Sequence, residues 1–373
     1  MTSAGVRTLF VYWGRRGAIS EIFLELVKVA GPDAWFSLAR QNELFGPVSA
    51  SAGDRLIAVD TFNHGFGAIA RLYRLWSIRR RIVAAIEKHR IERVVVLMSH
   101  VWTPLIAGSV RGTGARYVVV VHDAANHLGD VTAMANAWLI RDALKADEVV
   151  TLSAYVRDAL IARYPQIAAR SHVLFLPVMR SRTAAVRPPS DGLPGFLFFG
   201  RIMTYKGLPL FVEACEILRA RGHAFRIGVA GEGNLGQSGA RLAALGAVTI
   251  NRWLDYDDVS AILAQYDCMV LANIEASQSG VVALAHGFGM PVVANPVGGL
   301  TEQIRDRQSG LVARAVSAAA LADAMEMFLT DAGLRAQLAA GVANAQEEYS
   351  MVEFFRRITE SHPDRKGGGS GRA

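Results

Sequence analysis

Short apolar runs alternate with amphipathic stretches along most of this chain. Runs typical of buried strands include Thr8–Tyr12, Leu56–Val59, Arg93–Met98, Arg116–Val121 and Glu148–Leu152. Stretches with the period of an amphipathic helix, such as Ile19–Val29, fit between them. Strands that are apolar along their whole length are typical of parallel sheets covered on both faces. The pattern therefore predicts the α/β class, with parallel sheets.

The same alternation resumes after a segment rich in Pro, Ser, Gly and Arg, and 373 residues suit two domains of ordinary size. We therefore expect two Rossmann-like domains followed by a short amphipathic helix, Met351–Ile358, and a Gly/Ser tail that should be disordered. The expected boundaries are 1–178, a linker at 179–195, a second domain at 196–347, the last helix within 348–362 and the tail at 363–373.

Composition indicates the cellular compartment of the protein. Apolar residues make up 51% of the chain, enough for large cores. Cys215 and Cys268 lie in apolar surroundings without a disulfide or CxxC spacing, which favours free thiols in a reducing compartment. The first residues lack the apolar region of a signal peptide, and we find no apolar run long enough to span a membrane. These features predict a cytoplasmic protein.

The net charge of +7 is concentrated in the amino half. Residues 1–180 hold 22 Lys and Arg against 14 Asp and Glu, whereas the remainder holds 18 against 19. We find no nucleic-acid-binding module, so an anionic membrane surface or an anionic acceptor is preferred to nucleic acid as the partner.

The basic excess includes one amphipathic stretch, residues 71–88. At helical spacing, one face of this stretch is apolar, and three cations lie together on its flank. The apolar face holds Leu72, Leu75, Ile82, Val83 and Ile86, and the flank holds Arg74, Arg81 and Lys88. Two interpretations remain open: a helix that lies on the inner face of an anionic membrane, and a core helix with a solvated basic flank.

The segment from Glu275 to Gly299 is the most informative about function. Its polar loop ends at Ser279-Gly280, where an apolar run of helical length begins. The start of a helix presents free N–H groups and the positive end of the helix dipole, which together hold a phosphate well. Glu275 lies close enough upstream to accept hydrogen bonds from a polyol joined to that phosphate. The combination suggests a nucleotide-sugar.

Two cations support this interpretation. Arg201 and Lys206 follow the apolar strand Phe196–Gly200 and precede a helix predicted at Pro209–Arg221. Ligands of open α/β sheets bind at the carboxyl ends of the strands, where an Arg fork and a Lys point charge can share a diphosphate. The alternative is a pair of solvated loop cations.

At this point the chain resembles glycosyltransferase family 4, the retaining nucleotide-sugar enzymes of the GT-B fold. The matching pieces span roughly residues 196–312, with further likeness in the amino half. They are G200-R201…K206-G207, V229-A230-G231-E232-G233, Y266-D267-C268-M269-V270, E275…S279-G280, P291-V292-V293-A294…G298-G299-L300-T301-E302, V119-V120-V121-H122-D123 and A146-D147-E148-V149-V150-T151-L152-S153.

The resemblance implies two Rossmann-like domains facing a cleft, with the last helix crossing back to the first domain. It implies a sugar transferred with retention from a nucleoside-diphosphate sugar to a hydroxyl of a glycan or lipid-linked acceptor, as in cell-envelope polysaccharide biosynthesis. His122 and Glu275 would lie beside the donor sugar, and Gly14 and Arg15 in the first loop would close over its diphosphate. The base would meet the loop that holds Trp253 and Asp255. No metal or other cofactor is expected.

Each amino-half residue also has a plainer interpretation. His122 would then be a polar residue at the end of a strand, and Gly14 and Arg15 would belong to a tight turn. His100 also ends a strand and is a weaker candidate on the acceptor side.

Two motifs match the patterns of other kinds of site, a dinucleotide site and a metal site. Gly231–Gly236 matches GxGxxG after a strand, but two more glycines follow and any helix there is short, which argues against a dinucleotide site. Asp255-Tyr256-Asp257 matches the metal-binding DxD pattern, but it opens a predicted helix at Asp257–Gln265, so helix capping is the preferred interpretation.

One departure from the family pattern leaves alternatives open. The second glutamate of the family, which grips the ribose, is absent, because Ala283 and Leu284 stand at its place. This absence is the sign of one alternative to a transferase, a non-enzymatic nucleotide-sugar binding protein. A GT-B nucleotide-sugar epimerase is the other alternative.

Overall fold

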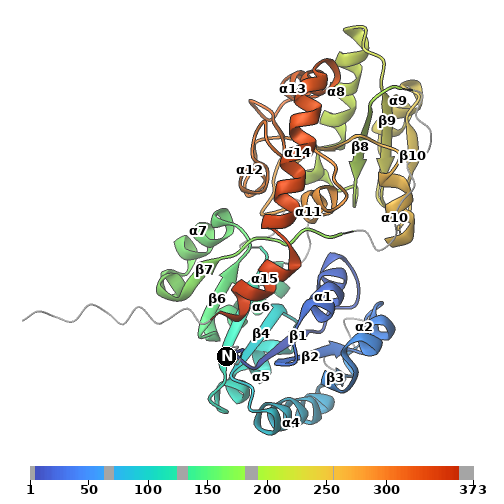
Figure 1. Ribbon diagram of the computed structural model, residues 1–373. Helices are drawn as coiled ribbons and strands as arrows, with labels where there is room; N and C mark the ends of the chain where they lie inside the picture. The colour runs from blue at the N-terminus through green and yellow to red at the C-terminus, as the bar shows by residue number, and fades with distance from the viewer. Residues whose placement is uncertain (1–4, 63–70, 124–132, 181–191, 255, 361–373) are drawn as a thin grey trace, which may run out of the picture. The chain divides into compact units, whose positions relative to one another are not determined.

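The computed structural model describes residues 5–62, 71–123, 133–180, 192–254 and 256–360. Within these ranges the chain divides into two units. Unit 1 runs to Leu174 and includes the helix that begins at Met351, and unit 2 runs from Phe175 to Ser350. Each unit is built around one parallel sheet (Figure 1).

Unit 1 has a seven-stranded sheet in the order β3-β2-β1-β4-β5-β6-β7. Its strands are β1 (Thr8–Tyr12), β2 (Ala34–Ala39), β3 (Leu56–Val59), β4 (Arg93–Met98), β5 (Arg116–Val121), β6 (Glu148–Thr151) and β7 (Ser171–Val173). Its α-helices are α1 (Ala18–Val29), α2 (Phe45–Ala52), α4 (Leu72–His89), α5 (Thr103–Arg111), α6 (Ala133–Lys145), α7 (Ala154–Arg163) and α15 (Met351–Thr359).

Unit 2 has a six-stranded sheet in the order β10-β9-β8-β11-β12-β13. Its strands are β8 (Gly195–Phe199), β9 (Arg226–Ala230), β10 (Val248–Ile250), β11 (Cys268–Leu271), β12 (Val292–Ala294) and β13 (Gly310–Val312). Its α-helices are α8 (Leu208–Ala220), α9 (Ser238–Ala244), α10 (Tyr256–Leu263), α11 (Gly280–Gly287), α12 (Leu300–Gln303), α13 (Ala318–Thr330) and α14 (Ala332–Glu348).

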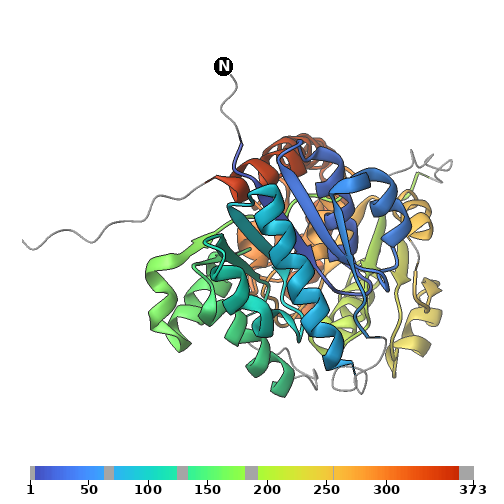
Figure 2. The same cartoon turned by 90° about the horizontal axis from the view of Figure 1, so that it is seen from below.

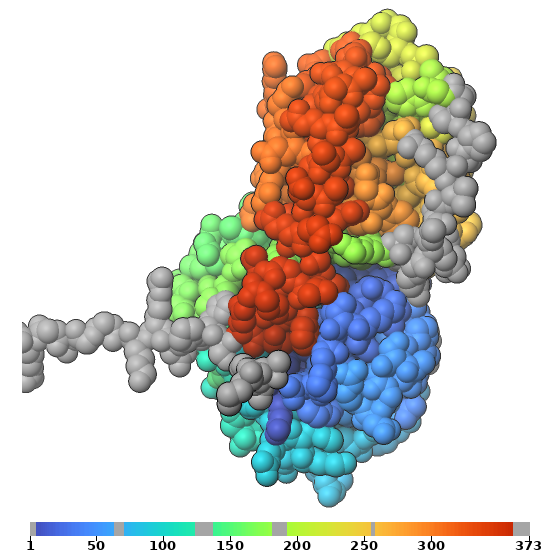
Figure 3. All heavy atoms as spheres, in the orientation of Figure 1, coloured from blue at the N-terminus to red at the C-terminus, as the bar shows by residue number. Residues whose placement is uncertain are grey.

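Helices cover both faces of the first sheet, which explains why its strands are apolar throughout. Leu9 of β1 belongs to a core with Ile82 of α4. The next side chain, Phe10, points to the other face, where its ring lies 6.1 Å from Phe36 and 5.9 Å from Phe355 of α15. The α15 helix also packs against α1, as Figures 1 and 3 show. The predicted α/β class, with two Rossmann-like parallel-sheet units, is confirmed.

Each sheet contains a point at which the strand order reverses. In unit 1 this switch lies between β1 and β4, and in unit 2 it lies between β8 and β11. Chains leaving two neighbouring strands at a switch point turn to opposite faces of the sheet, which opens a crevice at the carboxyl ends. The loops after β1 and β4, and those after β8 and β11, are therefore the places where each sheet offers room for a ligand.

Parts of the predicted linker and tail lie outside the described residues, namely 181–191 and 361–373. Of the linker that is described, Met179 belongs to unit 2 and donates its N–H to the carbonyl of Ala283 at 3.1 Å. Among the described helices, none is long and apolar enough to cross a membrane.

Candidate nucleotide-sugar site

The loop after β8 carries Arg201 and Lys206 on an unusual backbone path. It begins at Gly200, whose φ of 102° favours glycine, and ends at Gly207, whose φ of 70° does so as well. Between them, Thr204–Lys206 form a single 3₁₀ turn, and Gly207 then opens α8. The sequence places both cations after a strand, and the two glycines let the chain fold back over the end of the sheet.

This loop packs directly on the loop after β11. A Cβ built on Gly207 would lie 2.0 Å from the carbonyl oxygen of Ala272, so no larger residue fits there. The N–H of Ile274 donates to the carbonyl of Tyr205 at 2.8 Å. The segment holding Lys206 and the segment holding Glu275 are thereby joined backbone to backbone at the switch point of the sheet.

The start of α11 lies beside the loop that follows β8. A Cβ on Gly200 would lie 3.4 Å from Cγ2 of Val281, in the first turn of that helix. Arg201, the next residue, is exposed. The structure thus brings together four predicted positions from two loops, Arg201, Lys206, Glu275 and Gly280.

The two cations of the first loop differ in environment. The Lys206 side chain is half-buried, and its ammonium lies 5.5 Å from the centre of the Tyr205 ring. Burial lowers the pKa of Lys206 to about 8, and the neighbouring Arg201 guanidinium adds to the effect. An anion that paired with both cations would remove the repulsion and raise that pKa again.

The backbone at the start of α11 already has side-chain partners. Ser279 is the N-cap, and its hydroxyl accepts from the N–H of Val281 at 3.2 Å. The N–H of Ser279 donates to Oε1 of Gln303 at 2.7 Å, and Nε2 of Gln303 donates to the Ser279 carbonyl at 3.2 Å. A phosphate here would meet the Gly280 amide directly, but it would reach the Ser279 amide only if Gln303 turned away.

Glu275 is half-buried in a loop that is fixed at several points. The side-chain amide of Asn273 donates to the Glu275 carbonyl at 3.2 Å. The carbonyl of Ala276 accepts from Gly299 N–H at 3.2 Å, which ties the loop to the Gly298-Gly299 turn. The backbone on both sides of Glu275 is therefore held in place by its neighbours.

The GxGxxG motif has a packing explanation. A Cβ on Gly231 would lie 2.0 Å from the carbonyl oxygen of Gly200, and one on Gly233 would lie 2.4 Å from that of Ile202. These glycines let the chain after β9 approach the loop that carries Arg201. The following helix, α9, begins only at Ser238, so the motif lacks the helix start that a dinucleotide site uses.

The predicted base-binding positions, Trp253 and Asp255, lie between β10 and α10, and the DxD motif continues into α10. Trp253 is 37% exposed there, and its carbonyl accepts from Arg252. Asp255 lies outside the described residues, so the DxD motif is only partly described. Within the described part of the chain, no group of three or more His, Cys, Asp and Glu is placed to hold a metal ion.

Ala283 and Leu284, which replace the second glutamate of the family, are both buried in α11. The carbonyl of Ala283 accepts the Met179 N–H, and the backbone of Met179 also lies against Gly287, whose Cβ would meet its oxygen at 2.0 Å. This side of α11 is therefore covered by the chain itself.

In unit 1, His122 follows β5 and is held by the strand beside it. Its Nε2 lies 2.7 Å from the carbonyl oxygen of Leu97, and because a carbonyl only accepts, the proton is on Nε2. Burial lowers the pKa of His122, so its ring is neutral at pH 7.

His100 follows β4 and has a clear structural role. Its Nδ1 accepts from the N–H of Trp102 at 3.3 Å, at the start of α5. Burial lowers its pKa to about 4. Its ring lies among those of Trp13, Phe62 and Trp102, with centroids 5.1–6.0 Å away.

The first loop of unit 1 also contains a close approach. A Cβ on Gly14 would lie 2.4 Å from the Tyr12 hydroxyl oxygen. The carbonyl of Gly14 accepts from the side-chain amide of Asn42 at 2.9 Å. Arg15 is exposed, and its carbonyl accepts from Glu43 N–H at 2.8 Å. Packing thus accounts for Gly14, whereas Arg15 is an exposed residue of the loop at the switch point of the unit 1 sheet.

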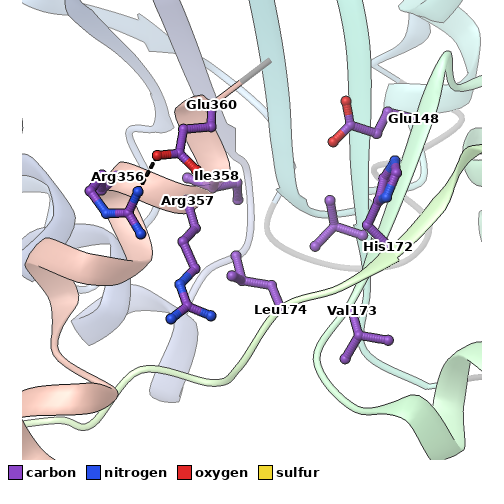
Figure 4. A pocket seen from close by; sticks show the side chains of 9 residues that line it. Glu148, His172, Val173, Leu174, Arg356, Arg357, Ile358 and Glu360 are labelled. Carbon is purple, nitrogen blue, oxygen red and sulfur yellow. Dashed lines mark hydrogen bonds and ion pairs between the residues drawn. The ribbon is translucent and has the colours of Figure 1, made fainter. Parts of the chain in front are cut away.

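Unit 1 also contains a hollow of about 200 Å³ between β6, β7 and α15 (Figure 4). Its charged walls are already paired: Glu148 with Arg93 at 2.7 Å and Arg116 at 3.2 Å, and Arg356 with Glu360. None of the predicted site residues lines it. We assign it no part in donor binding.

The fold and the two switch points define a GT-B type of protein, and comparison with known proteins agrees. Residues 40–181 match the family described as "Glycosyltransferase Family 4", and residues 194–331 match "Glycosyl transferases group 1". The chain belongs to this glycosyltransferase family.

Individual curated relatives match only part of the chain. The chain is 32% identical over 229 residues to D-inositol 3-phosphate glycosyltransferase of Salinispora arenicola, covering 53% of this chain and 50% of the relative. It spans about half the length of the curated relatives it matches first.

Solved structures resemble it over nearly the whole chain. Anabaena Alr3699/HepE, in complex with UDP and glucose, has a TM-score of 0.72 at 14% identity, covering 95% of this chain and 98% of that one. A glycosyltransferase from Rickettsia africae has a TM-score of 0.68 at 17% identity, covering 94% and 96%. At such identities the likeness concerns the fold.

Proposed function

We propose that the protein is a retaining glycosyltransferase that moves a sugar from a nucleoside-diphosphate sugar to a hydroxyl of a glycan or lipid-linked acceptor. One observation carries this proposal. The loops after β8 and β11 are joined at Gly207 and Ala272, which brings Arg201 and Lys206 to the loop that holds Glu275. Family membership and the UDP and glucose bound by the Anabaena protein support it.

The donor would be held by its diphosphate. Arg201 and Lys206 supply two positive charges, and the start of α11 supplies the Gly280 amide and the helix dipole. Trp253 and Asp255 would meet the base, and Arg15 and Gly14 would approach the diphosphate from unit 1. Glu275 would accept hydrogen bonds from hydroxyl groups of the sugar.

The chemistry would depend on charge at the leaving group. As the bond between C1 of the sugar and the phosphate oxygen breaks, negative charge develops on the nucleoside diphosphate, and the two cations stabilise it. The acceptor hydroxyl would attack C1 from the face that the phosphate leaves, and its proton would pass to the departing phosphate oxygen. His122, neutral and fixed by Leu97, would lie beside the sugar as a hydrogen-bonding group. No metal ion or other cofactor is needed in this scheme.

A non-catalytic nucleotide-sugar binding protein is the second candidate. The buried Ala283 and Leu284 favour it, since no carboxylate at these positions can hold the ribose. Release of nucleoside diphosphate from UDP-glucose and GDP-mannose, with and without acceptors, separates the candidates. A transferase releases the diphosphate faster when acceptor is present, an epimerase converts the donor without acceptor, and a binding protein does neither.

A lipid-linked acceptor would require contact with a membrane, and α4 is the candidate surface. Most of the apolar face predicted from the sequence is turned inward, with Ile82 1% and Ile86 2% exposed in the core of unit 1, whereas Leu72 at its start is 43% exposed. The outer face instead carries Tyr73 at 71% and Trp76 at 63% exposure. Figure 2 shows α4 along the surface of unit 1.

We propose that this outer aromatic and basic face meets an anionic membrane. The Arg80 guanidinium lies 4.6 Å from the centre of the Trp76 ring, and Arg81 and Lys88 are exposed nearby. Each Lys or Arg near anionic lipid adds about 1 kcal/mol of binding free energy, and aromatic side chains such as Trp bury at the bilayer interface.

Co-sedimentation with phosphatidylglycerol vesicles tests the membrane contact. Binding should weaken in salt, in an Arg74/Arg81/Lys88 triple Ala variant and in a Tyr73/Trp76 double Ala variant. Equal recovery with phosphatidylcholine vesicles would leave α4 as a core helix with a solvated face.

A further inference from the structure

The carboxamide of Gln303 lies at the end of α12 and holds the backbone where α11 begins. It accepts the Ser279 N–H at 2.7 Å and donates to the Ser279 carbonyl at 3.2 Å. One planar side chain thereby bonds both backbone polar groups of Ser279, its N–H and its carbonyl. This fixes the peptides on either side of Ser279, including the one that carries the Gly280 N–H.

The helix that carries Gln303 is itself tied to the same loop. It begins directly after the Gly298-Gly299 turn, where the Gly299 N–H donates to the Ala276 carbonyl at 3.2 Å. Leu300 of α12 is fully buried. The glutamine therefore projects from an anchored support, and its two hydrogen bonds transmit that position to the start of α11.

We propose that Gln303 is the positioning residue of the phosphate-binding turn. It keeps the Gly280 N–H directed at the diphosphate while remaining bonded to Ser279 itself. This inference rests on the proposed nucleoside-diphosphate site. Gln303 lies one residue beyond the motif that ends at Glu302, so the family resemblance assigns it no role.

The opposite end of α11 supplies a matched control. Nε2 of Gln346, on α14, donates to the carbonyls of His286 at 2.7 Å and Gly287 at 3.2 Å. Like Gln303, Gln346 is half-buried and binds the backbone of α11 twice. Figure 1 shows α11, α12 and α14 within unit 2. Gln303→Met and Gln346→Met therefore each delete two side-chain hydrogen bonds to the backbone, one pair at each end of the same helix.

Calorimetric titration of UDP into the full chain, with GDP and ADP titrated in the same way, tests the proposal. The Kd of the nucleotide that binds should rise about tenfold in Gln303→Met, the order expected when one hydrogen bond to a charged group is lost. It should change less than twofold in Gln346→Met. Gln303→Glu can still accept from Ser279 but places a negative charge beside the diphosphate, so it should bind more weakly than Gln303→Met and recover part of the loss in high salt.

The outcomes distinguish a wrong proposed function from a wrong role for Gln303. If the wild-type protein binds none of the three nucleotides, the proposed function is wrong. If it binds one and Gln303→Met matches the wild type, or both Met variants lose affinity equally, Gln303 has only a structural role. Thermal unfolding of the variants shows that each is folded at the temperature of the titration.

Discussion

The backbone of Gly207 lies against that of Ala272, so that a Cβ on Gly207 would be 2.0 Å from the Ala272 carbonyl oxygen. This contact joins the two loops that form the proposed donor site. In Gly207→Ala the methyl group would force the loops apart, in addition to the strain of a φ of 70°. We expect a loss of about 2–5 kcal/mol in the free energy of unfolding and a large loss of nucleoside diphosphate affinity.

Gly222→Ala is the control for this prediction. Gly222 has a φ of 88°, but nothing lies within 4 Å of the place that a Cβ would take, so only strain is added. It should lose about 1–2 kcal/mol and keep its affinity. Denaturant unfolding and calorimetry on both variants measure the two effects, and equal losses of affinity would show that contact between the loops does not maintain the site.

Lys206 is predicted to lower the stability of the free protein. Because its pKa falls from 10.5 to about 8 in the folded state, the charged form is disfavoured there. The resulting penalty is fully present below pH 8 and disappears as the pH rises towards 10.5. Lys206→Met should therefore raise the free energy of unfolding by about 1–3 kcal/mol at pH 7, by less at pH 9.5, and should weaken diphosphate binding. A loss of stability at pH 7 would mean that the ammonium is stabilised in the free protein.

Diphosphate binding should also be linked to protonation of Lys206. An anion between Arg201 and Lys206 raises the pKa of the ammonium again, so the free protein takes up protons on binding near pH 8. Titrations in two buffers of different ionisation enthalpy measure this uptake, and affinity should fall as the pH rises above 8. Lys206→Arg stays charged over this range and should show neither effect. Equal proton uptake by this variant would assign the linkage to another group.

The sequence predicts the fold well and the site in part. Apolar runs such as Thr8–Tyr12 and Leu56–Val59 give their strands with the observed bounds, because a strand covered on both faces is marked along its whole length. Arg201, Lys206 and Glu275 are likewise marked by their places after strands. The sequence does not show that Arg201 is exposed and Lys206 half-buried, because this difference depends on how the loop folds back.

Long-range contacts carry no local signal. Gln303 binds Ser279 from 24 residues away, in a four-residue helix, and nothing in its neighbourhood distinguishes it from a surface glutamine. The sequence likewise does not show what covers the apolar face of α4. A helical period shows which residues lie together but not whether the core or a membrane covers them. Ile78, which is buried with Ile82 and Ile86, completes the face that meets the core.

Glu275→Gln is predicted to separate sugar contact from nucleotide contact. The amide keeps the shape but loses the charge that would accept from sugar hydroxyls, so turnover should fall about 10²- to 10³-fold. UDP lacks the donor sugar, so its affinity should stay within about twofold. Glu213→Gln, on the exposed side of α8, is the control and should match the wild type. Loss of UDP binding by a folded Glu275→Gln variant would place Glu275 at another part of the ligand.

The most direct test of the proposed donor site is a calorimetric titration of UDP, GDP and ADP in the presence of EDTA. The wild-type chain and an Arg201→Met/Lys206→Met double variant are compared, and thermal unfolding shows that both are folded. We predict that the wild type binds at least one nucleotide without metal, and that the double variant loses about 2–4 kcal/mol of binding free energy, the order expected for lost charged partners. Equal binding by the two proteins, or binding by the wild type only after Mg²⁺ or Mn²⁺ is restored, would contradict this prediction.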